Sequence, residues 1–433
     1  MIDPVFAERR ARVLEAMKSG VLVVFSAPQA IRNNDVEHEY RQDSDFHYLA
    51  GFDEPESVLV LSRVHEKPFV LFVRPKDPER ETWDGPRAGV DGAVAEFGAV
   101  EAFPIAELAQ RLPDFLENAD RLYYRIGRDR AADDRVLSAL ERTRPRARRG
   151  SSYPTEIVDT ETVLHELRRK KDAGEVALLQ RAIDITAEAH VAAMAAVRPG
   201  MHEYEIEALL RGVFRRNGSE RPAYAPIVGS GANSTILHYH QNDRKMDAGD
   251  LLLVDAGAEY GYYAADVTRT FPVSGEFTPP QRRIYDLVLA AQDASIAATK
   301  PGATLDAVHA ESVRVITEGL VELGLVQGPV DAAISEERYK RYYMHKTSHY
   351  LGMDVHDVGR YFVGGKPRPL EEGVVFTVEP GIYVAAHDDQ APAEYRGIGV
   401  RIEDDVLVTA DGCRVLSEAI PKRRRDVELA CRK

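Results

Sequence analysis

The chain has 433 residues, more than the roughly 250 to 300 at which a single hydrophobic core stops growing, so two domains are expected. Hydrophobic residues make up 44% and charged residues 29%, as in an ordinary globular protein. No window approaches the roughly 18 to 20 uninterrupted apolar residues of a membrane span. The formal net charge of -14 disfavours a general affinity for nucleic acid phosphates, which requires clustered lysine and arginine.

The remaining compositional signals exclude several kinds of site. The first ten residues have no basic segment leading into an apolar core, so no secretory signal is expected and a cytoplasmic location is favoured. Cys413 and Cys431 are too few for a disulfide framework and lack the spacing of a cysteine-based zinc site. Two basic clusters, residues 142–149 and 422–425, are interpreted as solvated faces, not as binding patches.

Short apolar runs in the first third of the chain predict buried strands, because they are rich in valine, leucine and phenylalanine and are bounded by proline, aspartate and lysine. Helical patterns lie between some of them. Together they indicate an α/β N-terminal domain, residues 1–165; the runs are residues 21–25, 57–61 and 68–73.

Polar segments of this domain are candidates for a site as well as for simple loops. Residues 32–35 and 40–46 are dense in polar groups and are interpreted as a hydrogen-bonded surface loop. Trp83, the single tryptophan, has charged, glycine and proline neighbours that predict a loop. A tryptophan in a loop marks an interface or a ligand wall as often as it packs beneath the loop.

The second domain, residues 166–433, is predicted to repeat its own helices, and the linker before it is expected between about residues 142 and 170. Thr278, Pro279 and Gln281 supply an N-cap, an N1 proline and a capping-box partner for the third helix. The predicted helices are residues 178–193, 204–214, 284–291 and 305–323.

The repeat extends into the strands, where carboxylates stand in equivalent places. Asp255 ends an apolar run six residues after a glycine, and Glu379 does the same in the second half. Asp266 opens the next strand of the first half, and Glu403 lies in the last strand segment of the second. Two halves related by a pseudo-twofold axis would bring the four carboxylates together.

Four buried carboxylates repel one another and must be protonated or meet cations, so we interpret the set as a site for two divalent metal ions. A histidine from residues 344–357, which hold His345, His349 and His356, is the expected fifth ligand, and His238 could join them. This oxygen-rich set with one imidazole suits Mn²⁺, Co²⁺ or Mg²⁺. Such a pair of ions lowers the pKa of a shared water, so hydrolysis is the expected chemistry.

Five motifs stand in chain order in the second domain: residues 255–257 (DAG), 266–272 (DVTRTFP), 348–352 (SHYLG), 377–381 (TVEPG) and 401–404 (RIED). Together they resemble the aminopeptidase P (Xaa-Pro aminopeptidase) branch of the pita-bread metallopeptidases. Further motifs of the same branch occur at residues 40–46 (YRQDSDF) and 51–56 (GFDEPE), so the resemblance covers nearly the whole chain. It implies an α/β (α+β) chain with an N-terminal aminopeptidase P-type domain and a C-terminal pita-bread catalytic domain.

The resemblance also implies roles for single residues. The metal ligands would be Asp255 for one ion, His349 and Glu379 mainly for the other, and Asp266 and Glu403 for both. The bridging hydroxide is the implied nucleophile, and Mn²⁺ is the favoured ion, with Co²⁺ or Zn²⁺ as alternatives. The other implied site residues are Glu379 and the histidines His238 and His356 as catalytic groups, and Tyr383, Arg401, His345, Asp35 and Trp83 as supporting or substrate-binding groups.

The implied reaction is release of the first residue from peptides with proline in second position, by a homo-oligomer, a dimer or tetramer, in which Asp35 and Trp83 contribute across subunits. The Xaa-Pro bond has no N–H and a fixed φ, so general peptidases lose a contact there. Lys346 and Thr347 depart from the small residues common in the family, which leaves the ligand set intact and alters the pocket rim.

Related families remain as alternatives. An Xaa-Pro dipeptidase (prolidase) shares the fold and the ligands. Methionine aminopeptidases lack the long N-terminal domain, and creatinase-like enzymes have the fold without the metals. Non-catalytic pita-bread interaction modules have lost ligands, whereas this chain keeps all five.

Overall fold

The computed structural model describes residues 4–432, so the first three of the ten N-terminal residues considered above, and Lys433, lie outside the described residues. The chain divides into two compact units, Met1–Leu167 and Arg168–Lys433. Among the described residues, no helix is long and apolar enough to cross a membrane.

The N-terminal unit is built on one mixed sheet with the strand order β6-β5-β4-β1-β7-β8. The pairs β1/β4 and β4/β5 are antiparallel, whereas β5/β6, β1/β7 and β7/β8 are parallel. The three apolar runs predicted from the sequence are confirmed as β1, β4 and β5. The strands are β1 (Val21–Phe25), β4 (Val58–Ser62), β5 (Phe69–Val73), β6 (Glu101–Pro104), β7 (Arg121–Tyr123) and β8 (Glu156–Val158).

Among the residues that the structure describes, six helices and a hairpin complete this unit, and α7 (Leu164–Arg169) follows them in the chain. The amphipathic helices α5 and α6 pack leucine, phenylalanine and alanine on the apolar side chains of the sheet. The helices are α1 (Pro4–Ala16), α2 (Ser44–Ala50), α3 (Pro78–Asp84), α4 (Gly89–Ala95), α5 (Leu108–Leu116) and α6 (Arg130–Thr143), and the hairpin is β2 (Ile31–Asn33) with β3 (Val36–Glu37).

Two expectations about polar segments of this unit were wrong. Residues 42–46 are not a surface loop: they are buried, and α2 begins at Ser44, with Asp43 as the N-cap that accepts the N–H of Phe46. Gln42 explains why a polar segment can be buried, since its amide accepts from Ala27 N and donates to two carbonyl groups. Trp83 lies in the last turn of α3 and not in a loop, because Asp77 caps that helix and Pro78 begins it.

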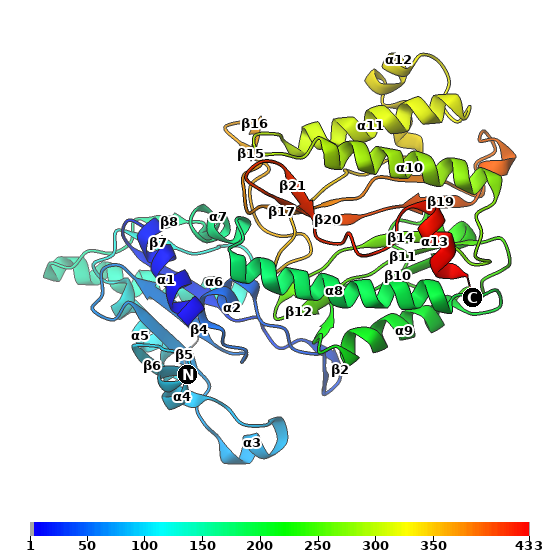
Figure 1. The fold of residues 1–433 in the computed structure, drawn as a ribbon. Coiled ribbons are helices and arrows are strands. Elements are labelled where there is room, and N and C mark those ends of the chain that lie inside the picture. The colour runs from blue at the N-terminus through cyan, green and yellow to red at the C-terminus, as the bar shows by residue number, and fades with distance from the viewer. Residues whose placement is uncertain (1–3, 433) are drawn as a thin grey trace. The chain divides into compact units, whose positions relative to one another are not determined.

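Two pairs of helices border the strands of the C-terminal unit, α8 (Ala173–Ala196) with α9 (Glu203–Arg216), and α10 (Pro279–Ala297) with α11 (Leu305–Glu322) (Figure 1). All four helices were predicted. The proposed capping box is supported by the N–H of Thr278, which donates to Gln281 Oε1 at 2.9 Å. Two short helices, α12 (Val330–Ser335) and α13 (Arg424–Cys431), complete the helices of this unit among the described residues.

The strands of this unit form a repeated pattern of small antiparallel sheets. In the first half, β11 pairs with β10 and β14; in the second, β17 pairs with β20, and β18 pairs with β19. The strands are β9 (Arg221–Pro222), β10 (Ile227–Ser230), β11 (Leu251–Asp255), β12 (Ala258–Tyr260), β13 (Tyr263–Ala264), β14 (Thr268–Pro272), β15 (Phe362–Val363), β16 (Lys366–Pro367), β17 (Val375–Val378), β18 (Gly381–Val384), β19 (Ile398–Arg401), β20 (Asp404–Val408) and β21 (Cys413–Val415).

Hydrogen bonds between the two halves set the positions of the carboxylates. Thr268 O accepts from the N–H of Glu403 at 3.1 Å, and Thr270 Oγ1 donates to Arg401 O at 3.0 Å. The ends of β14 and β19 therefore lie side by side. This arrangement joins the repeated halves at the point where each carries its acidic residues.

Candidate metal centre

Each half of the repeat presents its carboxylates in the same way. Asp255 is the last residue of β11 and stands opposite Thr268 in the register with β14, and Asp266 lies just before β14. Glu379 directly follows β17, and Glu403 directly precedes β20. In an antiparallel pair the end of one strand lies beside the beginning of the next, which is why residues far apart in sequence meet here.

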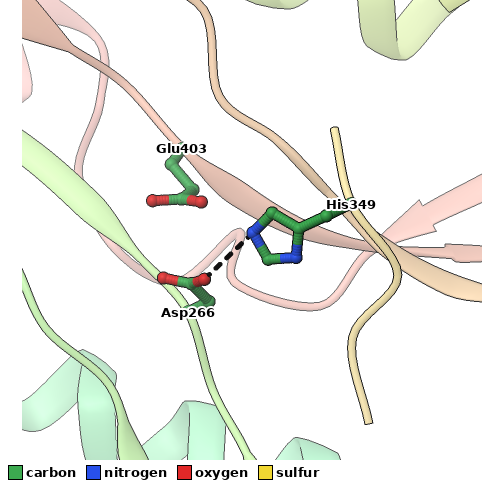
Figure 2. Close-up of side chains that lie close together, drawn as sticks. All are labelled: Asp266, His349 and Glu403. Atoms are coloured by element: carbon green, nitrogen blue, oxygen red, sulfur yellow. Dashed lines mark ion pairs between the residues drawn. The ribbon is translucent and has the colours of Figure 1, made fainter. Parts of the chain in front are cut away.

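Three side chains from three different segments meet in a cluster suited to a metal ion. Asp266, His349 and Glu403 each offer a ligand atom, and these atoms lie within 4.8 Å of one another. Figure 2 shows the imidazole of His349 turned toward Asp266, with Glu403 on the neighbouring segment. His349 Nε2 lies 3.3 Å from Asp266 Oδ2 and 3.4 Å from Glu379 Oε1, so Glu379 belongs to the same group.

Asp255 joins the cluster through shared partners. The hydroxyl of Tyr224 lies 2.5 Å from Asp255 Oδ1 and 2.6 Å from Asp266 Oδ1, so this single group links both carboxylates. Arg401 Nη2 donates to Asp255 Oδ2 at 2.5 Å. All five sequence-predicted ligands are thus brought together in the C-terminal unit.

Burial makes the negative charge of this group costly. Burial is the largest cause of the raised pKa of Glu403, which lies well above its usual value. The negative charges of Asp266 and Glu379 raise this pKa further. Burial also raises the pKa of Glu379 to about 7, with His349 opposing, and raises the pKa of Asp255 against the effect of Arg401. Carboxylates that are held together at this cost are stabilised by divalent cations, so the donor set fits metal ions.

The histidine is electrostatically tied to the same carboxylates. Burial alone lowers the pKa of His349, but the hydrogen bond to Asp266 and the charge of Glu379 outweigh it and raise that pKa to about 9. Nδ1 of the ring lies 3.1 Å from Tyr350 O. A carbonyl partner on one ring nitrogen leaves the other directed at the carboxylates, as in histidine ligands of metals.

The remaining predicted residues of this unit surround the cluster. Tyr383 accepts from Arg401 Nη1 at 2.9 Å, and its hydroxyl also lies 2.9 Å from His345 Nε2. Burial and the charge of Arg401 lower the pKa of His345 to about 4. The ring of His356 lies edge-on to His349, with centroids 4.3 Å apart.

His238 is exposed, and no hydrogen bond of its side chain occurs among the described residues. It is near enough to the site that its charge lowers the pKa of both His345 and His356. Burial is the larger cause of both shifts.

Two predicted residues belong to the N-terminal unit. Asp35 lies in the exposed turn of the β2/β3 hairpin, and Trp83 is 83% exposed. An exposed indole is available to a partner, but the contribution of these two residues across subunits stays a prediction.

Sequence reasoning missed several residues that support the site. Tyr224, between the carboxylates, is one. Thr268 Oγ1 donates to Glu403 Oε2 at 2.6 Å, and Asp405 Oδ2 accepts the N–H of Asp266 at 3.2 Å. Asp405 stands next to the RIED motif and could have been noticed, whereas Tyr224 has no comparable signal in the sequence.

The two residues that depart from the family pattern, Lys346 and Thr347, differ in their exposure to solvent. Lys346 is largely exposed, whereas Thr347 is buried and its hydroxyl lies 2.8 Å from His309 Nδ1. Thr347 O accepts the N–H of Glu379 at 2.8 Å, so the backbone at this point supports a predicted ligand whatever its side chain is.

Comparison with known proteins assigns both units. The model of metallopeptidase family M24 matches residues 177–410, and the model of the aminopeptidase P N-terminal domain matches residues 6–123. A Xaa-Pro aminopeptidase of Escherichia coli is 44% identical over 426 residues, 98% of this chain and 96% of the relative.

Solved structures agree over the full length. An aminopeptidase PepP of Pseudomonas aeruginosa superposes with a TM-score of 0.96 at 48% identity, covering 98% of this chain and 97% of that one. A zinc-substituted aminopeptidase P of Escherichia coli in complex with product gives a TM-score of 0.95 at 43% identity, covering 99% and 97%.

Proposed function

The chain belongs to metallopeptidase family M24, with an aminopeptidase P N-terminal domain, and on this premise we propose how its own residues hydrolyse the Xaa-Pro bond. The enzyme is a metal-dependent exopeptidase that releases the first residue from peptides with proline in second position. One observation carries the assignment to this chain, namely the convergence of Asp266, His349 and Glu403, with Asp255 and Glu379 beside them.

We propose two divalent ions, most favourably Mn²⁺, with Co²⁺ or Zn²⁺ as alternatives. Asp255 would hold one ion, His349 and Glu379 mainly the other, and Asp266 and Glu403 both. Five carboxylate or imidazole donors within one buried group support two ions better than one, because four carboxylates need about four positive charges. When bound, such ions lower the pKa of a water molecule and polarise the scissile carbonyl.

Glu379 is the proton acceptor in this proposal. It lies at the end of β17, where Thr377 Oγ1 donates to its Oε1 at 3.3 Å and the N–H of residue 379 is fixed by Thr347 O. A carboxylate held at a strand end is well placed to take the proton of the attacking water and to return it to the leaving nitrogen of proline. That return is needed because a prolyl amine leaves poorly without a proton.

His238 and His356 bind the carbonyl and the tetrahedral oxyanion. Both lie at the edge of the cluster, and burial together with the charge of His349 lowers the pKa of His356, which favours the neutral ring with one N–H to donate. His345, Tyr383 and Arg401 form a fixed hydrogen-bonded chain that ends on Asp255. Such a chain orients a carboxylate and restricts its rotation.

The N-terminal domain, residues 1–165, and the catalytic domain, residues 166–433, are proposed as separate functional parts. We also propose a homo-oligomer, supported by the exposure of Trp83, through which Asp35 and Trp83 reach a neighbouring site. A cytoplasmic location is supported by Cys413 and Cys431, which are both free.

The test compares substrates that distinguish an Xaa-Pro aminopeptidase from an Xaa-Pro dipeptidase. The Mn²⁺-loaded chain should cleave Xaa-Pro-Xaa tripeptides faster than Xaa-Pro dipeptides, and Glu379→Ala should abolish both activities. Glu372→Ala is the matched control, because Glu372 is an exposed glutamate near the start of the same strand. Cleavage of dipeptides alone would assign a dipeptidase, and failure to take up metal would contradict the proposed centre.

A further inference from the structure

A cavity of about 520 Å³ lies in the N-terminal unit at the carboxyl ends of the parallel strands β1, β7 and β8. The chain leaves β1 toward β4, β5 and β6 on one side of the sheet and returns to β7 and β8 on the other. Because β1, β7 and β8 are parallel, all three end at this edge of the sheet, whereas the antiparallel β4 begins there. The volume is within the range of about 300 to 1,000 Å³ that small-molecule sites occupy.

The inner wall of this cavity combines apolar side chains with three buried acceptor groups, of Asp43, Asp45 and Thr160, and Asp45 Oδ2 lies 2.9 Å from His165 Nε2. Val23, Tyr124 and Ala132 are buried and line it. Asp43 is also buried there, and each of its carboxylate oxygens accepts one bond, from Phe46 N at 3.0 Å and from an arginine at 2.5 Å, which leaves lone pairs for a further donor. Thr160 is 3% exposed, and its hydroxyl has no hydrogen-bond partner among the described residues.

The mouth of the cavity carries three guanidinium groups and one carboxylate. Arg125, Arg128 and Arg130 line it and are exposed, as is Asp129, whose Oδ1 accepts the N–H groups of Ala131 and Ala132. Arg128 is bound to Asp43, whereas neither Arg125 nor Arg130 has a carboxylate partner among the described residues. Arg130 is also the first residue of α6, whose N-terminus is already capped by Asp129.

The cavity therefore runs from acceptors inside to guanidinium groups outside, with an apolar wall between them. We propose that it binds a free α-amino acid with an apolar side chain, as the zwitterion. The ammonium group meets Asp43 and Thr160, the carboxylate meets Arg125 and Arg130, and the side chain packs on the apolar wall. Burial and the nearby Asp45 raise the pKa of Asp43 against the effect of Arg128, and a ligand ammonium group would stabilise its ionised form.

Equilibrium dialysis of the full chain with labelled L-leucine tests this site apart from the metal centre. The metal-free and the Mn²⁺-loaded chain should each bind one molecule at the new site, because no metal ligand lines it. N-acetyl-L-leucine, which lacks the ammonium group, and L-leucinamide, which lacks the carboxylate, should each bind at least about tenfold more weakly, since each loses a charge-assisted contact. Equal binding of either capped ligand would overturn the zwitterion assignment.

Two double variants assign the binding to this cavity. Arg125→Glu with Arg130→Glu should weaken leucine binding at least about tenfold. Arg148→Glu with Arg149→Glu makes the same change of charge at exposed positions away from the cavity and should leave binding unchanged. Thr160→Val should weaken it with little change of shape. If the metal-free chain shows no saturable binding, or if both double variants bind equally, the cavity is only a solvated crevice and the proposal fails.

Discussion

The loop that carries His356 is held by a buried ion pair whose contribution can be measured. Lys171 Nζ lies 2.8 Å from Asp357 Oδ2, and both side chains are 1% exposed. Arg168 Nη2 donates to the other oxygen of Asp357 at 2.8 Å, and the N–H of Asp357 donates to Tyr350 O. We predict that Asp357→Asn destabilises the protein and lowers kcat, because it releases the residue next to His356, which is proposed to bind the carbonyl or the oxyanion.

The magnitude follows from the separation and the burial. At 2.8 Å and an effective dielectric constant of about 20, the attraction between Lys171 and Asp357 is about 6 kcal/mol. Arg168 still neutralises Asp357 when Lys171 is replaced, so the pairwise coupling is smaller than this attraction. We expect a coupling energy of about 2 to 4 kcal/mol between Lys171→Met and Asp357→Asn.

A double-mutant cycle on the full chain, followed by chemical denaturation, measures this coupling. The control is the pair of Glu337 and Lys340, whose atoms are 2.7 Å apart but whose side chains are 58% and 49% exposed. The corresponding substitutions there should show no measurable coupling, because solvent screens an exposed pair. Equal coupling in the two pairs would refute the role of burial. Unchanged metal content in Asp357→Asn would show that the loss of kcat arises at His356.

Three further outcomes are expected. Tyr224→Phe should weaken metal binding about 10- to 100-fold by calorimetry, since the hydroxyl that links Asp255 and Asp266 is lost. Chelation should lower the Tm, and Mn²⁺ should restore it, because ions that bind only the folded chain stabilise it. Burial lowers the pKa of His190 from 6.5 to about 4, so the unfolded histidine binds a proton at a higher pH than the folded one. The stability that His190 contributes is therefore fully present above about pH 6.5 and is lost toward pH 4, by on the order of 3 kcal/mol. In urea unfolding of the metal-free chain, His190→Gln should remove most of this decline.

The convergence of the four carboxylates could be predicted because each follows or precedes a recognisable apolar strand. Asp255 and Glu379 stand at the ends of β11 and β17, and the repeat of helices before them gives their equivalence. Strand pairing then brings the ends of the two halves together without any further information. Local pattern and internal symmetry were therefore sufficient for this part of the site.

Tyr224 and residues 42–46 could not be predicted for a common reason. A polar side chain is buried only when partners from distant segments satisfy it, and Tyr224 finds them in Asp255 and Asp266, more than thirty residues away. Gln42 finds its partners in the backbone of Phe52 and Glu54. The polar composition of a segment does not show whether such partners exist, so an exposed loop is predicted for residues 42–46, and nothing in the sequence singles out Tyr224.

The symmetry that revealed the site also predicts where its two halves must differ. The carboxylates repeat, but His349 has no equivalent in the first half, and Arg401 binds Asp255 directly at 2.5 Å. A fixed guanidinium beside Asp255 reduces the attraction of that carboxylate for a second cation, whereas His349 adds a donor on the other side. Calorimetric titration of the metal-free chain should therefore show two unequal steps. If the charge of Arg401 is the cause, Arg401→Met should strengthen the weaker metal-binding step relative to the stronger one. Two equal, independent metal sites in the unmodified chain would contradict this account.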